Sequence, residues 1–133
     1  ISKVKITDKQ QNLVNDGLKA LGSMAAEIHG KDMSLEAVSP YLVEQQKVYK
    51  QFELICLFDD KGRVTAGTEL SLISDNDYSY RPYYREAIKG VDYKSEPYIS
   101  AFSYNYCITV SIPYKDAAGR ITGVIMADIC IED

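Results

Sequence analysis

The sequence has no tryptophan, one histidine and three cysteines. Cys56, Cys107 and Cys130 do not form a CxxC pair, so their spacing indicates neither a zinc site nor a disulfide framework. All three lie in apolar, strand-like runs, where a cysteine most often serves as a small core residue. A single disulfide between two strands remains an open alternative, and the cysteines by themselves do not identify the cellular compartment.

The sequence also has no run of about 18 or more apolar residues, so no segment is predicted to span a bilayer. Its first residues lack the charged and then apolar pattern of a signal peptide. The chain begins with Ile1 instead of methionine. We therefore expect a processed or excised part of a longer protein, with membrane segments lying outside the given sequence.

An excess of positive charge is absent too, since the net charge is -4 and the pI is near 5.0. An acidic protein without a basic stripe is not attracted to nucleic acid or to anionic membranes, so neither is expected as a partner. With 133 residues, 46% of them hydrophobic, residues 1–133 are predicted to form one domain that buries its own core.

Signatures of catalysis are missing as well. The sequence has no nucleophile elbow, no glycine-rich phosphate loop and no cluster of histidine and carboxylates for a metal. The one histidine, His29, precedes Gly30 in the last turn of a predicted helix, where it suits the helix terminus better than chemistry. We therefore predict a protein that is not an enzyme, with no catalytic residues, no metal and no cofactor.

Apolar residues with helical spacing predict a long amphipathic helix at about residues 7–29. Thr7 and Gln10 match a capping box, and Gly30 is a natural stop. The apolar stripe could pack on the domain's own sheet, which is the usual role of such a stripe, or on the same helix of a second subunit. It consists of Val14, Leu18, Leu21, Ala25 and Ile28.

The other elements are predicted from turn signals and alternation. Ser39 and Pro40 supply an N-cap and a first-turn proline for a second helix that reaches about Gln51, and Pro82 and Gly90 bound a short third helix. Strands are predicted at residues 52–58, 63–68, 98–103, 106–113 and 121–131, with a loop at 71–77. The result is an α+β fold whose antiparallel sheet of about five strands is covered by the long N-terminal helix and the short helices. In the first of these strands, alternation assigns one face to Phe52, Leu54, Cys56 and Phe58.

Nine of the eleven tyrosines lie between Tyr78 and Tyr114, in a stretch that also holds Arg81. Arg81 stands at the start of the third helix, where unpaired backbone N–H groups and the helix dipole add to its charge. A guanidinium in this position can hold a carboxylate through two parallel hydrogen bonds. In the alternative, Arg81 forms a surface ion pair with an acidic neighbour, namely Asp75, Asp77 or Glu86.

Asp128 interrupts an apolar strand and, by alternation, shares a face with Val124, Met126 and Cys130. An unpaired carboxylate in such a strand would be strongly unfavourable. We expect its partner to be backbone amides, Arg81 or the ammonium group of a ligand. If Arg81 and Asp128 face one cavity, their opposite charges suit a zwitterion such as a free amino acid.

Tyrosine rings can line a pocket while their hydroxyls reach polar ligand atoms. Alternation after Pro97 sends Tyr98 and Ser100 to the same side of a strand. Only two or three tyrosines are expected to touch a ligand. The candidates for walls and lid are Tyr78, Tyr80, Tyr83, Tyr98 and Tyr106.

Four blocks of sequence resemble, in order and spacing, the Cache (PDC, PAS-like) sensor domains that bacterial receptors display outside the membrane. They are RPYYREA at 81–87, PYIS at 97–100, ITVSIP at 108–113 and GVIMADI at 123–129. The resemblance covers nearly the whole chain and implies a PAS-like sheet that holds a small-molecule pocket. It also implies the extracytoplasmic, periplasmic part of an inner-membrane receptor, which feeds a histidine kinase, a chemotaxis receptor or a cyclic-dinucleotide enzyme.

The resemblance further implies a site at matching positions. In members that bind amino acids, an arginine and an aromatic residue two positions later hold the carboxylate, and Arg81 and Tyr83 match them. A tyrosine and a polar residue match Tyr98 and Ser100, and the aspartate that takes the ligand amine matches Asp128. Tyr83 replaces the usual tryptophan, and Ser100 stands where an aspartate is frequent. The second change favours a hydroxy, keto or short-chain acid as an alternative to an amino acid.

The first hypothesis is therefore a sensor domain for a small carboxylate ligand, forming a homodimer through the N-terminal helix in the receptor. A second hypothesis is a dimerising structural module without a ligand, motivated by the stripe of that helix. A third, an intracellular PAS-like domain with an organic cofactor, lacks an anchoring residue. The ligand site predicted under the first hypothesis comprises Tyr78, Arg81, Tyr83, Tyr98, Ser100 and Asp128.

Overall fold

The long N-terminal helix is α1, Asp8–Gly30, in a computed structural model that describes residues 5–132. Thr7 and Gln10 form the predicted capping box, since Thr7 Oγ1 accepts from the Gln10 N–H at 3.1 Å and Gln10 Oε1 accepts from the Thr7 N–H at 2.9 Å. The apolar stripe of α1 packs on the domain's own sheet, with Val14, Leu21 and Ile28 buried. The helix is thus explained by local capping and by burial of one face.

The second helix, α2, spans Leu35–Val48, so the predicted start at Ser39 and Pro40 is wrong. The first turn is already helical because the Ser34 carbonyl accepts from the backbone N–H of Ala37 at 2.9 Å. Pro40 therefore lies inside the helix, where it leaves one carbonyl without its intrahelical donor. The Ser39 hydroxyl caps no helix but accepts from the backbone N–H of Gly67 at 3.0 Å.

Within residues 5–132 the strands form one six-stranded antiparallel sheet. Its order is β2-β1-β6-β5-β3, and β4 pairs with β5 beside β3. The α+β class and the antiparallel sheet are confirmed. The strands are β1 (Phe52–Phe58), β2 (Val64–Gly67), β3 (Tyr93–Lys94), β4 (Tyr98–Ile99), β5 (Tyr106–Lys115) and β6 (Ile121–Cys130).

Two strand predictions need correction. Residues 101–103 form a turn and not the second half of a strand, because the Ser100 hydroxyl accepts from the backbone N–H groups of Phe102 at 3.1 Å and Ser103 at 3.2 Å. Tyr104 then has a positive φ of 62°, which ends the extended conformation. The strand β3 was not predicted, since its two residues carry no alternation of their own.

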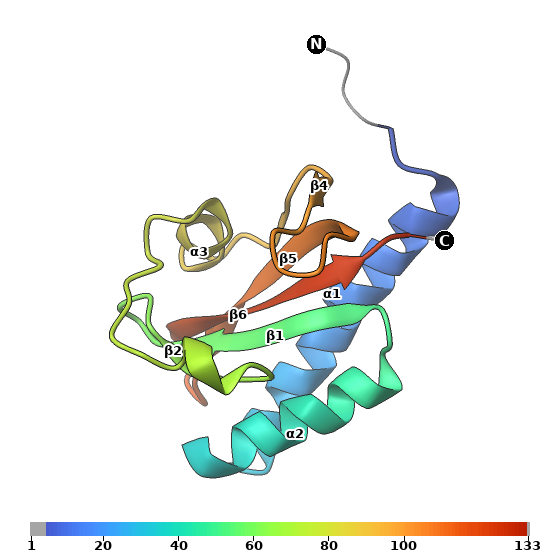
Figure 1. Ribbon diagram of the computed structural model, residues 1–133. Coiled ribbons are helices and arrows are strands. Elements are labelled where there is room, and N and C mark those ends of the chain that lie inside the picture. The colour runs from blue at the N-terminus through green and yellow to red at the C-terminus, as the bar shows by residue number, and fades with distance from the viewer. Residues whose placement is uncertain (1–4, 133) are drawn as a thin grey trace.

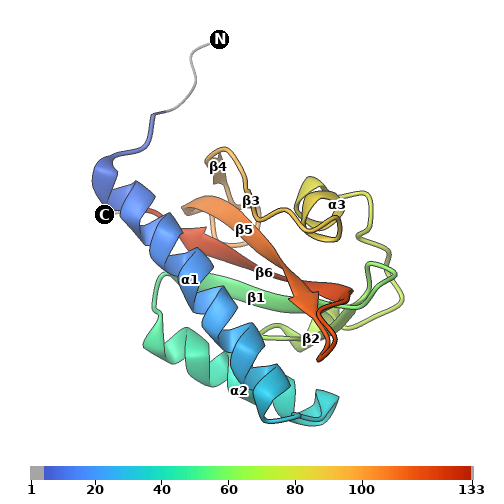
Figure 2. The ribbon, with the colours of Figure 1, turned by 180° about the vertical axis from the view of Figure 1, so that it is seen from behind.

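The two faces of the sheet carry different covers, as Figures 1 and 2 show. On one face, α1 packs across β5 and β6, and α2 packs against β1 and β2, which encloses the larger apolar core. On the other face lie the short helix α3 (Pro82–Ala87), the 3-10 turn η1 (Leu70–Leu72) and the segment through β4. A smaller apolar cluster around Phe58, Tyr84 and Met126 fills this side.

A β-bulge near the start of β1 changes the faces of its side chains. Phe52 pairs with Ile129 and Leu54 pairs with Asp128, so Glu53 is one extra residue on β1. Phe52 consequently packs in the helix-side core, whereas Leu54 belongs to the opposite face. The prediction that Phe52 shares a face with Leu54 is wrong for this reason.

None of the helices in the described part of the chain is both long and apolar enough to cross a bilayer.

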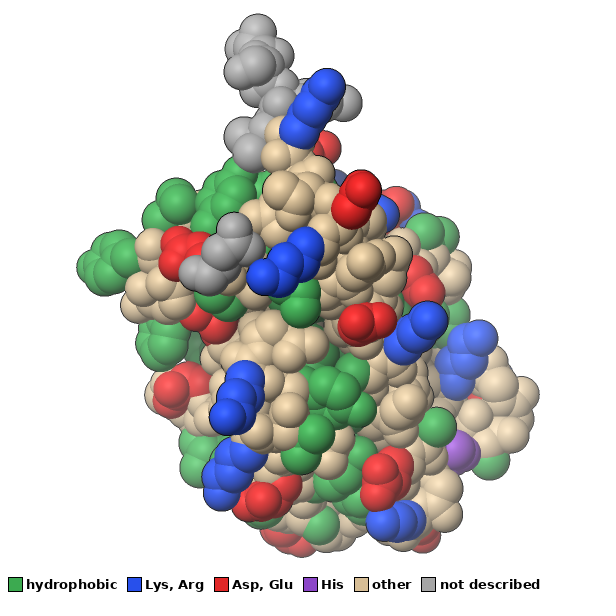
Figure 3. All heavy atoms as spheres, turned by 90° about the vertical axis from the view of Figure 1, so that its right-hand side faces the viewer, with side chains coloured by type: hydrophobic (Ala, Val, Ile, Leu, Met, Phe, Trp, Pro, Cys, Tyr) green, Lys and Arg blue, Asp and Glu red, His purple; other side chains and the backbone are tan. Residues whose placement is uncertain are grey.

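Figure 3 views the molecule from the right of Figure 1, and basic and acidic side chains are interspersed over that surface. The expectation that nucleic acid is not a partner stays a prediction.

Candidate functional site

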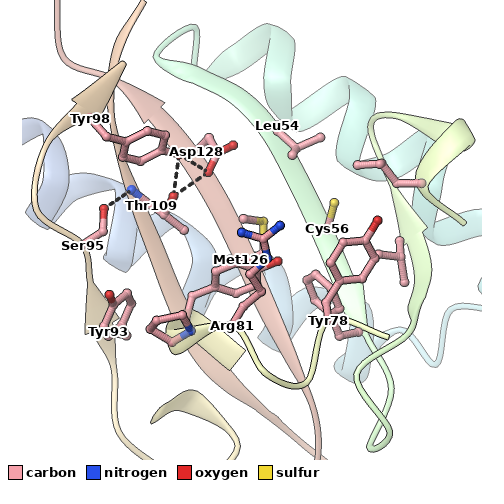
Figure 4. A pocket seen from close by; sticks show the side chains of 15 residues that line it. Leu54, Cys56, Tyr78, Arg81, Tyr93, Ser95, Tyr98, Thr109, Met126 and Asp128 are labelled. Carbon is pink, nitrogen blue, oxygen red and sulfur yellow. Dashed lines mark hydrogen bonds between the residues drawn. The ribbon is translucent and has the colours of Figure 1, made fainter. Parts of the chain in front are cut away.

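A cavity of about 370 Å³ lies on the face of the sheet that α1 and α2 leave uncovered. Its floor comes from β1, β5 and β6, and its walls come from α3, β3, β4 and the segment before α3. Five of the six predicted site residues line it. They are Tyr78, Arg81, Tyr83, Tyr98 and Asp128. Figure 4 shows how Tyr78, Arg81, Tyr98 and Asp128 lie around it.

Arg81 is the N-cap of α3, as predicted, and Pro82 begins the helix. The Arg81 backbone carbonyl accepts from the N–H groups of Tyr84 and Arg85, both at 3.0 Å, which fixes its position at the cavity wall. Its guanidinium carbon lies 5.2 Å from the ring centre of Tyr80, a cation–π contact. The exposed guanidinium forms no ion pair with any residue of the range 5–132.

The alternative role for Arg81, a surface pair with a neighbouring acid, is therefore not found among the described residues. Asp77 instead accepts from the Ser79 N–H at 2.8 Å, and Glu86 pairs with Lys89 at 3.6 Å. Since no carboxylate within residues 5–132 pairs with this guanidinium, its donors can bind a ligand anion.

Asp128 holds a three-part hydrogen-bond network with Tyr98 and Thr109. Its Oδ1 accepts from the hydroxyls of Thr109 at 2.8 Å and Tyr98 at 3.1 Å, and these two hydroxyls are 2.7 Å apart (Figure 4). As alternation predicted, Asp128 lies on the same face as Val124 and Met126. The expected partners were backbone amides, Arg81 or a ligand, and the two hydroxyls are partners that the sequence did not indicate.

Burial raises the pKa of Asp128, while the hydrogen bonds from Thr109 and Tyr98 act to lower it and the charge of Glu53 raises it further. The result is a carboxyl group whose pKa lies above its ordinary value. Burial and the charge of Asp128 likewise raise the pKa of Tyr98, so its hydroxyl keeps its proton and remains a donor. The hydrogen bonds from these two hydroxyls stabilise the charged form of Asp128, which burial in the partly apolar cavity disfavours.

The tyrosines on the other side of the cavity are positioned by aromatic packing. The Phe58 ring lies 5.9 Å from that of Tyr78 and 5.7 Å from that of Tyr83, centre to centre. The Tyr83 carbonyl accepts from the Ser111 hydroxyl at 2.7 Å, and this bond ties α3 to β5. Burial raises the pKa of Tyr83, whereas the charge of Arg81 acts to lower it and that of Asp128 to raise it.

Ser100 lies outside this cavity, although it was predicted to be a site residue. It is buried, and its hydroxyl caps the turn at 101–103. It lines an adjoining cavity of about 420 Å³ together with Leu54 and Asp128, both of which also line the first cavity. Two of the candidate tyrosines lie elsewhere, since Tyr80 is exposed beside Arg81 and Tyr106 packs against the helix-side core.

Sequence reasoning missed Thr109, although the alternation of Cys107, Thr109 and Ser111 with buried apolar residues contained the signal. It also missed Glu53, for which alternation indicated only the side opposite to Phe52 and Leu54. The bulge turns Glu53 toward the second cavity, where its carboxylate accepts from the side chains of Ser103, Asn105 and Cys107. Burial alone would raise the pKa of Glu53, but these three hydrogen bonds outweigh it and lower the pKa.

Residues 19–133 match the family model of the first PDC sensor domain of methyl-accepting chemotaxis protein-like receptors, and the chain belongs to this family. The resemblance inferred from the four sequence blocks is thus confirmed. Members of this family are sensor domains of receptors and not catalytic domains. No match was found among curated proteins.

Solved structures of sensor domains share the fold. The ligand-binding domain of the Pseudomonas fluorescens chemoreceptor CtaA, in complex with L-valine, is 24% identical with a TM-score of 0.70, and the match covers 92% of this chain and 55% of that one. The ligand-binding domain of the Pseudomonas aeruginosa PAO1 amino acid chemoreceptor PctC, in complex with GABA, is 19% identical with a TM-score of 0.73, and the match covers 93% of this chain and 57% of that one. The sensor domain of the Vibrio cholerae histidine kinase DctB is 17% identical with a TM-score of 0.65, and the match covers 94% of this chain and 53% of that one. The chain therefore spans about half the length of the structures that it matches.

Proposed function

We propose that this domain is the extracytoplasmic, periplasmic ligand-binding module of a bacterial membrane receptor and that it binds a small carboxylate-containing ligand. The single observation that carries the proposal is that the guanidinium of Arg81, which forms no ion pair within residues 5–132, lies on the same cavity as the carboxylate of Asp128. This membrane receptor is a histidine kinase, a chemotaxis receptor or a cyclic-dinucleotide enzyme. The cavity volume of about 370 Å³ suits a molecule of the size of an amino acid.

Arg81 takes the ligand carboxylate in this proposal. A planar guanidinium can form two parallel hydrogen bonds to a carboxylate, and no protein acid in the described part of the chain competes for it. Tyr78 and Tyr83 supply the apolar wall on this side, where their packing on Phe58 keeps both rings in place.

An amino acid is favoured over an acid without an amine because of the way Asp128 is bonded. Both protein donors approach Oδ1, and Oδ2 receives no hydrogen bond from residues 5–132. An ammonium group supplies three donors and a compensating positive charge, which a partly buried carboxylate requires. Ser100 takes no part in the first cavity and belongs to the edge of the site through the adjoining cavity.

The homodimer through α1 remains a prediction. The stripe that motivated it packs largely on the domain's own sheet, which leaves Leu18 and Ala25 partly exposed. This packing supports the ligand-binding role over that of a dimerising module without a ligand.

The test compares amino acids with acids that lack only the amine. L-Alanine, L-valine and GABA would be paired with propionate, isovalerate and butyrate, and each would be measured by thermal shift and calorimetry. An amino-acid ligand raises the melting temperature of the wild type while its amine-free partner does not. Arg81→Ala and Asp128→Ala both abolish that rise, and Arg85→Ala, an exposed arginine of the same helix outside the cavity, retains it. A ligand whose affinity is the same in both cavity variants as in the wild type would refute this site.

A further inference from the structure

Two of the three cysteines face each other across the sheet. In the register of β5 and β6, Cys107 is the direct partner of Cys130. The neighbouring pair is hydrogen bonded, since the Ile131 N–H donates to the Tyr106 carbonyl at 2.9 Å. The Cys130 N–H points the other way and donates to the Gln51 carbonyl at 2.7 Å. Cys107 and Cys130 therefore form a non-hydrogen-bonded pair, because the two kinds of pair alternate along an antiparallel ladder.

This kind of pair brings two side chains close together on one face. The Cα atoms of a non-hydrogen-bonded pair are about 4.5 Å apart, which lies within the range of about 4.4–6.8 Å found for disulfides. The charge of Cys130 contributes to the raised pKa of the Cys107 thiol, as expected of two close sulfur atoms. Both thiols are free in the structure.

The third cysteine provides an internal control. Cys56 lies on β1, where its partners across the sheet are Gly67 and Met126, so it has no cysteine opposite. It is 1% exposed, whereas Cys130 is partly exposed at the end of β6. An oxidant in solution consequently meets Cys130 before either of the other two thiols.

We propose that Cys107 and Cys130 form a cross-strand disulfide, which fastens the last residue of β6 to the start of β5. The oxidant is a small-molecule disulfide such as oxidised glutathione. The Cys130 thiolate attacks one of its sulfur atoms and releases one glutathione thiolate. The Cys107 thiolate then attacks the Cys130 sulfur and releases the second. In total the two protein thiols lose two protons and two electrons, and the glutathione disulfide is reduced to two thiols.

Closing this bond changes the neighbourhood of the second cavity. The Cys107 thiol donates to Glu53 Oε1 at 3.1 Å, and a disulfide removes that donor. Glu53 then retains the hydrogen bonds from Ser103 and Asn105, which belong to the segment between β4 and β5. The disulfide thus exchanges one hydrogen bond between β5 and β1 for a covalent link between β5 and β6. The disulfide does not require the ligand, but it rests on the proposed extracytoplasmic location, which supplies the oxidising conditions.

The test treats the whole chain, after full reduction, with oxidised glutathione, and maps its peptides without reduction. The expected product is a peptide that links Cys107 to Cys130, with Cys56 still available to an alkylating reagent after unfolding. The link also forms in Cys56→Ala, and it forms faster as the pH rises, because burial raises the pKa of the Cys107 thiol to about 12. The oxidised wild type melts at a higher temperature than the reduced form, whereas Cys130→Ser gains nothing from the oxidant. Glutathione retained on Cys130 without a link to Cys107, or a link that involves Cys56, would overturn the proposal.

Discussion

The Tyr98 hydroxyl donates to Oδ1 of Asp128 at 3.1 Å, although β5 lies between the strands that carry these two residues. Thr109 on β5 donates to the same oxygen at 2.8 Å. Both protein donors thus converge on one oxygen of a carboxyl group whose pKa burial has raised. The arrangement positions the carboxylate without neutralising its charge, which is what recognition of an ammonium group requires.

Asp128→Asn should separate stability from binding. The amide oxygen still accepts from Tyr98 and Thr109, and the penalty for burying a charge disappears, so the free domain should be as stable as the wild type or more stable. The affinity for an amino acid should fall by about 10- to 100-fold, because a hydrogen bond to a charged group contributes about 1.5–3 kcal/mol. Thermal denaturation and calorimetry on both proteins measure the two effects.

The same substitution tests the direction of the pKa shift. Because the folded pKa of Asp128 is raised, the folded state binds the proton more tightly than the unfolded state between the ordinary and the raised pKa. The stability contributed by this group therefore decreases as the pH rises through that interval, and Asp128→Asn should lack this decrease. A wild type whose stability, relative to Asp128→Asn, increases over the same interval would contradict the assignment.

Arg81→Lys should weaken binding although it keeps the positive charge. An ammonium group cannot form the two parallel hydrogen bonds of a guanidinium, so we expect a loss of about tenfold, with a larger loss for Arg81→Ala. Arg85→Lys, on the same helix but outside the cavity, should bind as the wild type does. Isothermal titration of all four proteins gives the ranking. If the wild type and Arg81→Lys bound the ligand with equal affinity, only the charge at position 81 would matter for binding.

Glu53→Gln should loosen the segment 100–105. The Glu53 carboxylate accepts hydrogen bonds from Ser103, Asn105 and Cys107. The NH2 group of a glutamine at this position would face some of these donors and could not accept from them. Because the pKa of Glu53 is lowered, its contribution to stability is present above the ordinary glutamate pKa and is lost as the pH falls through the folded value. On acidification, the backbone amides of residues 100–105 in the wild type should therefore exchange faster relative to those of the variant. In the variant these amides should exchange fast at every pH. Equal protection in the two proteins at neutral pH would argue against the tether.

Two glycines of α1 should respond in opposite ways to alanine. A Cβ on Gly17 would overlap Cδ1 of Ile129 and lie 3.3 Å from Phe52, both buried, whereas nothing lies within 4 Å of a Cβ on Gly22. Gly22→Ala should stabilise the domain by about 0.5–1 kcal/mol through helix propensity. Gly17→Ala should destabilise it by about 1–3 kcal/mol, the usual effect of overpacking a core. Urea denaturation of both variants tests the contrast, and a stabilising Gly17→Ala would show that Ile129 adjusts freely.

The parts of the fold that were predicted correctly rest on local signals. The capping box at Thr7 and the proline at position 82 each act within one helical turn, so the sequence alone identifies both helix starts. Regular alternation predicted the face of Asp128 correctly, because β6 has no extra residue between Gly123 and Cys130. Arg81 and Asp128 were proposed on one cavity, and both line it.

The failures arise where a distant contact overrides a local signal. Ser39 and Pro40 have the composition of a helix start, yet the Ser39 hydroxyl bonds to Gly67 on β2 and the helix begins before it. The strand predicted through Ser103 fails for a local reason, since the Ser100 hydroxyl closes a turn two residues later, and the contact of Ser100 with a ligand stays a prediction. Thr109 was visible in an alternating pattern, whereas the role of Glu53 depends on a bulge that has no signature in one sequence.

That bulge also determines where β1 can change its length. The pairs on either side of Glu53, Phe52 with Ile129 and Leu54 with Asp128, would be consecutive partners in a regular ladder if Glu53 were absent. Deleting Glu53 would therefore keep each remaining side chain on its present face, while removing the acceptor of three hydrogen bonds. Deleting any residue from the middle of the strand would instead exchange core and cavity faces along part of β1. The domain can accordingly gain or lose this acid, and with it the attachment of the neighbouring segment, without redesign of its sheet.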